Sequence, residues 1–383
     1  MNSSRLSVLV RGVWPCAIWL GIWPLAGQTR SEPKPLLSEQ VFKDVQVLKG
    51  IPVSEFMATM GFFSASLGEN CTYCHGEESG GSWEKYADDN AHKRTARAMI
   101  AMVTAINKSY FAGRRMLTCY SCHRGGERPR ITPNLTELYG PPVPEEPDDI
   151  QSAPGAPSAD QIFDRYIQAL GGSERLAALT SFVAKGSYIG YADTEKSTVE
   201  IYAQAPRQRS TIVHTATGDA TTVYDGAAGW TAAPLVNRPV PLLALAGQEL
   251  DGARFDAELS FPARIKQALS GWRVGFAATI GDRDVDVVQA STAARSTVRL
   301  YFDKETGLLL RQVRYTGSPV GMSPMQMDYA DYREVSGVKM PFRWTVTWLD
   351  GRSTYELSEV QPNVTIDAAK FAQPAAPQPV RKP

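Results

Sequence analysis

Residues 71–76 read CTYCHG, and residues 119–124 read CYSCHR. Each stretch is a Cys-x-x-Cys pair followed immediately by a histidine. The chain has 5 cysteines and 4 histidines in 383 residues, so a histidine at the same offset after both pairs is a specific pattern. Cys16 lies in an apolar N-terminal segment, and the other four cysteines all belong to the two motifs. These motifs therefore decide how the N-terminal part of the chain folds and what it binds.

Several chemistries use Cys-x-x-Cys pairs, and they differ in what surrounds the pairs. A zinc ribbon places its two pairs about 15–20 residues apart and needs no histidine after each pair; here 44 residues (75–118) lie between them. A thioredoxin-like dithiol uses one motif in a strand–helix context, and paired disulfides leave the histidines unexplained. Covalent haem explains every position, because two thiols bond to the porphyrin and the next histidine binds its iron.

The motifs therefore predict two haem c groups, and with them a protein exported to where such haem is attached. The predicted attachment and proximal residues are Cys71, Cys74 and His75 for the first haem and Cys119, Cys122 and His123 for the second.

An amphipathic helix precedes each motif. Ser54 is a candidate N-cap of the first helix, which we expect to stop at Gly68, and the second helix covers about residues 91–110. Apolar residues recur at helical spacing in both. The stripes are Phe56, Met60, Phe63 and Leu67 in the first helix and Met99, Val103, Ile106 and Tyr110 in the second.

A methionine from each stripe is the predicted distal ligand, because a thioether is the partner of histidine in electron-carrying cytochromes. These ligands are Met60 for the first haem and Met99 for the second. A methionine at helical spacing can also simply fill a core. The competing residues are Met57, Met102, Met116 and His92, whereas His214 lies in the β-rich region and is expected to be structural.

The first 28 residues have the pattern of a secretory signal peptide. Arg5 and Arg11 precede the apolar run VWPCAIWLGIWPLAG at residues 13–27. We therefore expect a periplasmic protein, anchored to the membrane only if this segment is not cleaved. The 40 basic and 40 acidic residues give a net charge of zero, which gives no reason to expect a nucleic acid partner.

Composition divides the rest of the chain into further parts. Residues 29–127 form the expected dihaem unit, 128–158 a Pro-rich linker, 159–372 a β-rich domain and 373–383 a disordered tail. Turn pairs separate the β-rich runs at Asp225-Gly226, Ser336-Gly337 and Asp350-Gly351. Together with the helical stretches ADQIFDRYIQAL and FPARIKQAL, they predict an antiparallel sheet or open barrel with helices on one face.

Residues 45–127 resemble one half of the tetrahaem cytochrome subunit of photosynthetic reaction centres. The family's EF-x-x-x-M and AR-x-M…AIN patterns fall on Glu55, Phe56 and Met60 and on Ala96, Arg97, Met99, Ala105, Ile106 and Asn107. The resemblance implies a haem pair with a methionine ligand from the helix before each motif. Only one pair is present, and the family takes one distal histidine from its other half. The second haem therefore has Met99, His92 or an open position.

The C-terminal domain resembles the lipoprotein-carrier (LolA-type) family, through LYFDKETGLLLRQVRY at 300–315 and YREVSGVKMPFRWTV at 332–346. That fold implies an apolar cavity for a lipid or lipoprotein. The aromatic residues that can line a cavity or fill a core are Tyr188, Tyr202, Trp230, Phe276, Phe342 and Trp344.

The chain is therefore expected to be a multidomain protein, with a small all-α dihaem cytochrome c unit followed by an α+β open-barrel domain. We expect an electron carrier, not an enzyme, that acts with a redox partner protein. The alternatives are a haem enzyme or redox sensor of peroxidase type, and a lipid- or lipoprotein-binding module.

Overall fold

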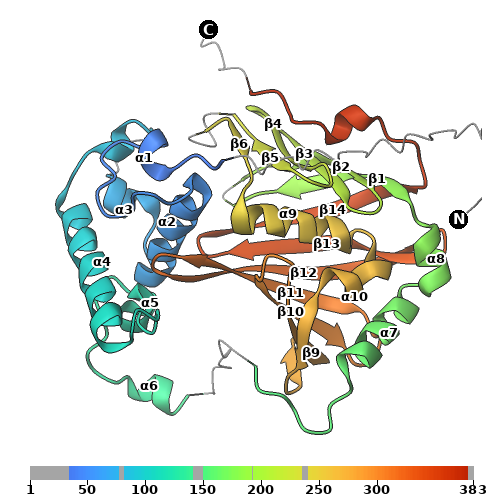
Figure 1. The fold of residues 1–383 in the computed structure, drawn as a ribbon, viewed down its shortest axis with the longest axis horizontal. Helices are drawn as coiled ribbons and strands as arrows, with labels where there is room; N and C mark the ends of the chain where they lie inside the picture. The colour runs from blue at the N-terminus through green and yellow to red at the C-terminus, as the bar shows by residue number, and fades with distance from the viewer. Residues whose placement is uncertain (1–33, 77–81, 141–149, 192, 235–239, 378–383) are drawn as a thin grey trace, which may run out of the picture. The chain divides into compact units, whose positions relative to one another are not determined.

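Two successive helix–motif units build the N-terminal part of the computed structural model (Figure 1). The structure describes residues 34–76, 82–140, 150–191, 193–234 and 240–377. Helix α2 (Val53–Leu67) leads to the short helix α3 (Cys71–His75), and helix α4 (Ala91–Tyr110) leads to α5 (Cys119–His123). The two long helices predicted from the apolar stripes are confirmed, and each motif forms one helical turn.

The sequence predicted the C-terminal end of α2 correctly but not its N-terminal start. The N-cap is Pro52 and not Ser54, so that prediction is wrong. Pro52 has φ −56° and ψ 149° and makes no side-chain cap, and its fixed φ is compatible with the start of a helix. Gly68 ends the helix as predicted, with φ 70° and its N–H donating to the carbonyl of Ser64.

The helical part is interlocked rather than arranged as two separate units. Helix α2 packs against α5, the motif of the second unit, while α4 contacts both α3 and α5. Three short helices that the sequence did not predict complete this part: α1 (Ser38–Val41), η2 (Lys85–Ala87) and α6 (Leu135–Leu138).

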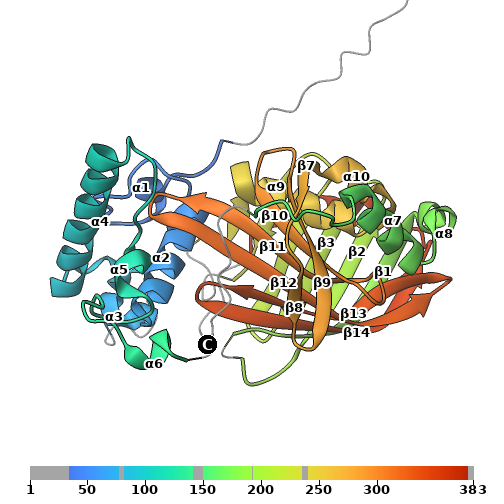
Figure 2. The same ribbon diagram turned by 90° about the horizontal axis from the view of Figure 1, so that it is seen from below.

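The C-terminal part is one 14-stranded antiparallel sheet (Figures 1 and 2). The strands are β1 (Ser181–Ile189), β2 (Ser197–Gln204), β3 (Gln208–Thr215), β4 (Gly218–Tyr224), β5 (Gly229–Ala232), β6 (Leu242–Ala244), β7 (Ser270–Val274), β8 (Ala278–Ile280), β9 (Arg283–Ser291), β10 (Thr297–Asp303), β11 (Leu309–Ser318), β12 (Gly321–Val335), β13 (Val338–Trp348) and β14 (Gly351–Pro362). Their order is β6-β5-β4-β3-β2-β1-β14-β13-β12-β11-β10-β9-β7, with β8 paired to β9. No pairing joins β6 to β7 among the described strands, so the sheet is open, as predicted.

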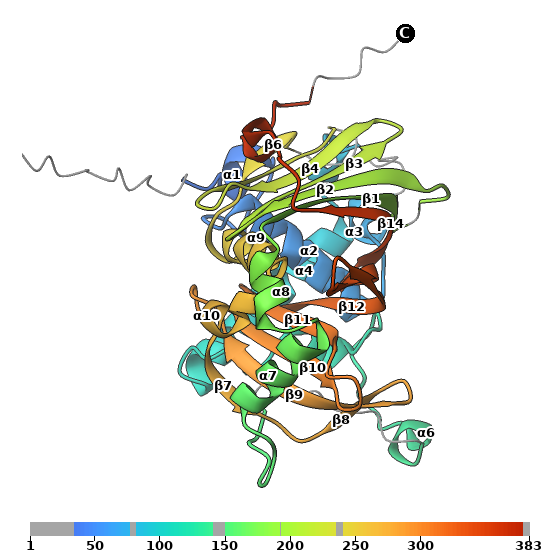
Figure 3. The same ribbon diagram turned by 90° about the vertical axis from the view of Figure 1, so that its right-hand side faces the viewer.

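Helices cover one face of this curved sheet (Figures 2 and 3). They are α7 (Ala159–Ala169), α8 (Ser173–Ala178), α9 (Gly247–Leu259), η3 (Pro262–Arg264) and α10 (Ile265–Ala268), and η4 (Ala368–Phe371) follows the last strand. Phe163 of α7 and Phe255 of α9 are fully buried against Ile201 and Phe302 of the sheet in the main core. The predicted architecture of sheet plus helices on one face is confirmed, although the sequence did not predict α9.

The aromatic residues proposed to line a cavity are mostly part of this core. Phe342 is buried in it, and Tyr188 and Trp344 pack against it. Tyr202 is buried and Trp230 half-buried. Phe276 is 61% exposed, so its predicted place in a cavity or core is wrong.

The hairpin turns of the sheet were predicted closely. Ser336 and Gly337 connect β12 to β13 with positive φ at both positions. Gly351 already belongs to β14, opposite Trp348, and the last turn is therefore Leu349-Asp350, one residue earlier than predicted.

Some predicted segments cannot be compared with the structure. The signal segment, residues 1–28, lies outside the described residues, as do residues 378–383 of the tail. Within the described ranges, no helix combines the length and apolar character needed to cross a bilayer. The predicted linker, residues 128–158, contains the short helix α6 and the buried residue Ile150.

Candidate haem-binding site

The two motif histidines are held in the same way. His75 is the last residue of α3, and its Nδ1 lies 3.0 Å from the carbonyl oxygen of Tyr86. His123 is the last residue of α5, and its Nδ1 lies 3.1 Å from the carbonyl oxygen of Gly126. Because a carbonyl can only accept, Nδ1 carries the proton in both rings and Nε2 keeps its lone pair. This is the arrangement of a histidine that binds a metal through Nε2.

The cysteines of each motif lie on one short, capped helix. The side chain of Asn70 accepts from the N–H of Thr72 at the start of α3, and Thr118 caps α5 in the same manner. All four thiols are free. Burial raises the pKa of three of these thiols, those of Cys71, Cys74 and Cys119, so the neutral form is favoured.

A zinc ribbon would bring the two cysteine pairs together. In the described part of the chain, no three side chains of the types His, Cys, Asp or Glu converge as metal ligands do. The pairs lie instead on two separate helical turns, α3 and α5. The two pairs are therefore not gathered around one point as they are in a zinc ribbon.

An unpartnered hydrogen-bond donor lies beside the first motif. The ring of Tyr86 stacks on His75, with centroids 4.5 Å apart, and the ring of Trp83 contacts Tyr86 at 5.3 Å. The Trp83 indole nitrogen is buried and has no hydrogen-bond partner within the described residues. A buried N–H without an acceptor is costly. It fits the carboxylate of a porphyrin propionate, so the residues around His75 suit a haem.

A pocket of about 300 Å³ lies beside Cys119. Ile100 and Val103 of α4 give it an apolar wall, and Lys108 and Arg115 bring two positive charges. The other lining residues are Thr104, Asn107, Gly113, Leu117, Pro319 and Val320. Apolar walls beside two cations are complementary to an apolar ring that carries carboxylates, so the second site also suits a haem.

Asn107 positions the second motif. It is 6% exposed near the end of α4, and its side chain accepts from the N–H groups of Met116 and Leu117. Its amide also donates to the carbonyl of Leu117 at 2.8 Å. These three hydrogen bonds fix the loop that leads into α5. The sequence placed Asn107 in a family pattern without predicting this role.

The candidate distal ligands differ in exposure. Met60 is half-buried on α2, whereas Met99 on α4 is 38% exposed. Met57 is half-buried, while Met102 and Met116 are exposed, and His92 is exposed with its ring 4.3 Å from that of Tyr73. The assignment of Met60 and Met99 to the two irons stays a prediction. His214 is on β3, where its Nδ1 lies 2.8 Å from a carboxylate oxygen of Asp219.

The structure adds one contact between the motifs that the sequence did not indicate. The hydroxyl of Tyr73, inside the first motif, donates to a carboxylate oxygen of Glu127 at 2.7 Å. Glu127 follows the second motif, and this bond raises the pKa of Tyr73 to about 12. No local pattern links residues 54 positions apart, so the pair is visible only once the chain is folded.

Fold and site together define a class of protein. It has a helical region with two Cys-x-x-Cys-His turns, in each of which Nδ1 of the histidine faces a backbone carbonyl oxygen, followed by an open antiparallel sheet. Residues 24–136 match the family described as photosynthetic reaction centre cytochrome C subunit.

Two relatives of that description are similar to the same part of the chain. The subunit from Thermochromatium tepidum is 37% identical over 97 residues, which is 24% of this chain and 23% of that protein. The subunit from Rubrivivax gelatinosus is 32% identical over 98 residues, which is 24% of this chain and 25% of that protein. The chain thus spans about a quarter of the length of these relatives.

Solved structures are similar to the C-terminal part. A LolA superfamily protein from Nitrosomonas europaea aligns over 57% of this chain and 98% of its own, with 14% identity and a TM-score of 0.40. A DUF1329 family protein from Desulfovibrio piger aligns over 56% and 96%, with 10% identity and a TM-score of 0.39. The open antiparallel architecture of the sheet is established by the order and the pairing of its strands.

Proposed function

We propose that this protein is an exported c-type cytochrome that carries electrons through two covalently bound haems. The observation that carries the proposal is the common geometry of His75 and His123, each with Nδ1 donating to a backbone carbonyl. The free thiols of Cys71, Cys74, Cys119 and Cys122 provide the two thioether pairs. The match of residues 24–136 to a cytochrome family supports the same proposal.

Each part of the site has a defined task. When bound, a haem supplies an iron that gains and loses one electron. The thiols would hold the ring, the carbonyls of Tyr86 and Gly126 orient the two imidazoles, and Nε2 of each histidine would supply a ligand to the iron. With Met60 and Met99 as distal ligands, neither iron keeps an open position for a substrate. Electron transfer to a redox partner protein is then the activity, without catalysis by the chain itself.

The attachment of haem is tested by mass and absorbance. The full chain is expressed in a host that matures c-type haem outside the cytoplasm, the predicted location of this protein. The intact mass should show two added haems, and the pyridine haemochrome spectrum should give the same number. Cys71→Ala/Cys74→Ala and Cys119→Ala/Cys122→Ala should each lose one haem. Fewer than two haems on the unmodified protein refutes the proposal.

A haem enzyme or redox sensor of peroxidase type is the second candidate. The exposure of Met99, at 38%, favours it, because an exposed thioether is held less firmly than a buried one. Carbon monoxide binding to the reduced protein separates the two functions. Rapid binding of carbon monoxide at one haem indicates an iron with an open position and contradicts a pure electron carrier. The absence of binding supports the electron carrier.

A lipid or lipoprotein ligand for the β domain is the third proposal. Helices α7 to α10 pack against one face of the sheet, and their side chains form a continuous core with it. This packing gives the electron-carrier proposal more support than the lipid-binding proposal. Extraction and mass spectrometry of the purified full chain is the test, and a stoichiometric lipid would establish the ligand.

A further inference from the structure

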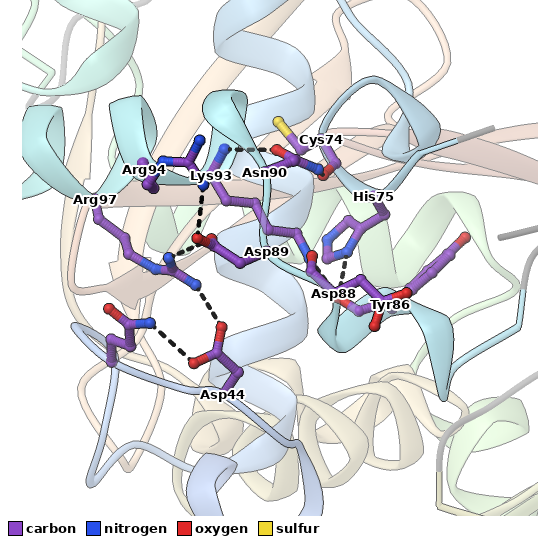
Figure 4. A network of polar contacts seen from close by, with 11 residues as sticks. Asp44, Cys74, His75, Tyr86, Asp88, Asp89, Asn90, Lys93, Arg94 and Arg97 are labelled. Atoms are coloured by element: carbon purple, nitrogen blue, oxygen red, sulfur yellow. Dashed lines mark hydrogen bonds and ion pairs between the residues drawn. The ribbon is translucent and has the colours of Figure 1, made fainter. Parts of the chain in front are cut away.

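A lysine reaches the carbonyl group that orients the first haem ligand (Figure 4). Lys93 lies in the first turn of α4, and its Nζ donates to the carbonyl oxygens of Tyr86 and Asp88, at 2.6 Å each. The same Tyr86 oxygen accepts from Nδ1 of His75 at 3.0 Å. An ammonium group and the predicted iron ligand therefore share one acceptor.

Two of the three neighbouring carboxylates are paired with arginines. Asp89 accepts from Arg94 at 2.9 Å and from Arg97 at 2.7 Å, and Asp44 accepts from Arg97 at 2.9 Å. Asp88 is exposed, and it holds Lys93 through its backbone carbonyl. Lys93 is thus the positive charge that lies closest to the His75 ring in this network (Figure 4).

Asn90 caps the N-terminus of α4, the helix that carries Lys93. The side-chain oxygen of Asn90 accepts from the backbone N–H of Lys93 at 3.0 Å. The amide nitrogen of the same side chain donates to the carbonyl of Cys74 at 2.7 Å. Asn90 therefore joins the first turn of α4 to the first motif and fixes the backbone from which the Lys93 side chain extends.

The second histidine has a different environment. Its carbonyl partner is that of Gly126, in the loop that directly follows α5. Among the residues that the structure describes, no lysine or arginine side chain donates to the Gly126 carbonyl. The two predicted ligands thus share a hydrogen-bond geometry, but the carbonyl that orients His75 also accepts from an ammonium group.

We propose that Lys93 raises the reduction potential of the haem at His75 relative to that of the haem at His123. This inference rests on the proposed function. A nearby positive charge disfavours the ferric iron, which carries one more positive charge than the ferrous iron. Sharing the Tyr86 carbonyl also weakens the bond from Nδ1, so that the imidazole donates less to the iron. Both effects have the same sign, and both favour the reduced state of the first haem.

Spectroelectrochemical titration of the full chain tests this inference, with each haem measured alone. The Cys119→Ala/Cys122→Ala background carries the first haem, and the Cys71→Ala/Cys74→Ala background carries the second. Lys93→Met removes the charge and keeps the length of the side chain. In the first background it should lower the equilibrium constant for reduction about tenfold, which is about 59 mV for one electron. In the second background it should change nothing.

Two further variants serve as controls. Lys93→Arg keeps the charge and should keep the potential of the first haem. Arg94→Met removes one positive charge from the same helical turn, at a side chain that is 62% exposed and bonded to Asp89, and should have a much smaller effect.

Each contrary outcome overturns a definite statement. Equal shifts for Lys93→Met and Arg94→Met would mean that net charge, and not the shared carbonyl, sets the potential. An unchanged potential with both haems attached refutes the role of Lys93 while leaving the proposed function intact. If Lys93→Met and Lys93→Gln both lose the first haem and Lys93→Arg keeps it, Lys93 serves attachment, and the tuning role is wrong. Absence of haem from the unmodified protein refutes the proposed function itself.

Discussion

The close approach of Gly68 and Gly125 gives the sharpest prediction for the helical part. Gly68 ends α2 with φ 70°, a backbone conformation that favours glycine. A methyl group at Gly68 would overlap the carbonyl oxygen of Gly125 and lie 3.1 Å from its carbonyl carbon. Both are backbone atoms, and the same segment is held by the Gly125 N–H, which donates to the carbonyl of Ser66 at 2.9 Å. Gly68→Ala must therefore shift one segment against the other.

The magnitude follows from two terms. The left-handed conformation costs an alanine about 1–2 kcal/mol. Loss of the hydrogen bond from Gly125 to Ser66 costs about 0.5–1.5 kcal/mol more, and the steric overlap adds to this. We expect Gly68→Ala to lower the free energy of unfolding by at least about 1.5–3.5 kcal/mol. Gly50→Ala is the matched control, because Gly50 has φ 78° and a methyl group there would meet no atom within 4 Å.

Guanidinium chloride unfolding of the haem-loaded full chain measures the difference. Circular dichroism in the Soret band follows the helical part, and far-ultraviolet circular dichroism follows the whole chain. Gly68→Ala should lower the midpoint of the Soret transition more than Gly50→Ala does. If both variants lower the free energy of unfolding equally, the contact between Gly68 and Gly125 contributes nothing, and the reasoning is refuted.

Three further predictions concern single side chains. Met60→Ala should shift the spectrum of one haem and lower its potential, with both haems still attached by mass; an unchanged spectrum and potential would place the ligand elsewhere. Trp83→Phe should lower the reduction potential of the first haem, or make that potential depend more strongly on pH, because a propionate loses a buried hydrogen-bond donor. Redox titration should show no change at the second haem, and equal effects on both haems would contradict this. Burial acts to raise the pKa of Asp303, but hydrogen bonds from Thr306 and the charge of Arg283 hold that pKa below its ordinary value. A lowered pKa means that the ionised group stabilises the fold above about pH 3.9 and that this contribution is lost as the pH falls. Asp303→Asn should therefore lower the free energy of unfolding, measured with urea, at pH 7. At pH 3 the free energies of the variant and of the parent protein should be closer to each other. A stability difference of the same size at both pH values would refute this prediction.

Local patterns in the sequence predicted the elements of the fold but not their contacts. The period of apolar residues gave α4 its bounds at Ala91 and Tyr110, and Gly68 marked the end of α2. Helix α9 was not predicted, because GQELDGARFDAEL has no regular apolar stripe and contains an internal glycine at Gly252. The helix is stabilised by burial of Phe255 against the sheet, a tertiary effect that a local pattern does not contain.

In the candidate site, too, local motifs could be predicted from the sequence and long-range contacts could not. The two Cys-x-x-Cys-His motifs are local, so their residues could be predicted one by one. The carbonyl partners of the histidines, the orphan donor of Trp83 and the ammonium of Lys93 come from loops and helix starts around them. Their positions depend on how residues 82–90 fold back on α3, and the local sequence SWEKYADDN has no periodic pattern that would predict this path.

The interlocked packing of the helical part bears on why the two motifs occur together. Helix α2 precedes the first motif and packs against α5 of the second, while α4 precedes the second motif and contacts α3 of the first. Tyr73 and Glu127 join the motifs directly, and the Gly68–Gly125 contact joins the ends of the same segments. A chain with one helix–motif unit alone would therefore expose faces that the other unit covers. The pair of helix–motif units, and not the single unit, is the smallest unit that this packing can support, and the separation of the two motifs is set by the same contacts that stabilise the fold.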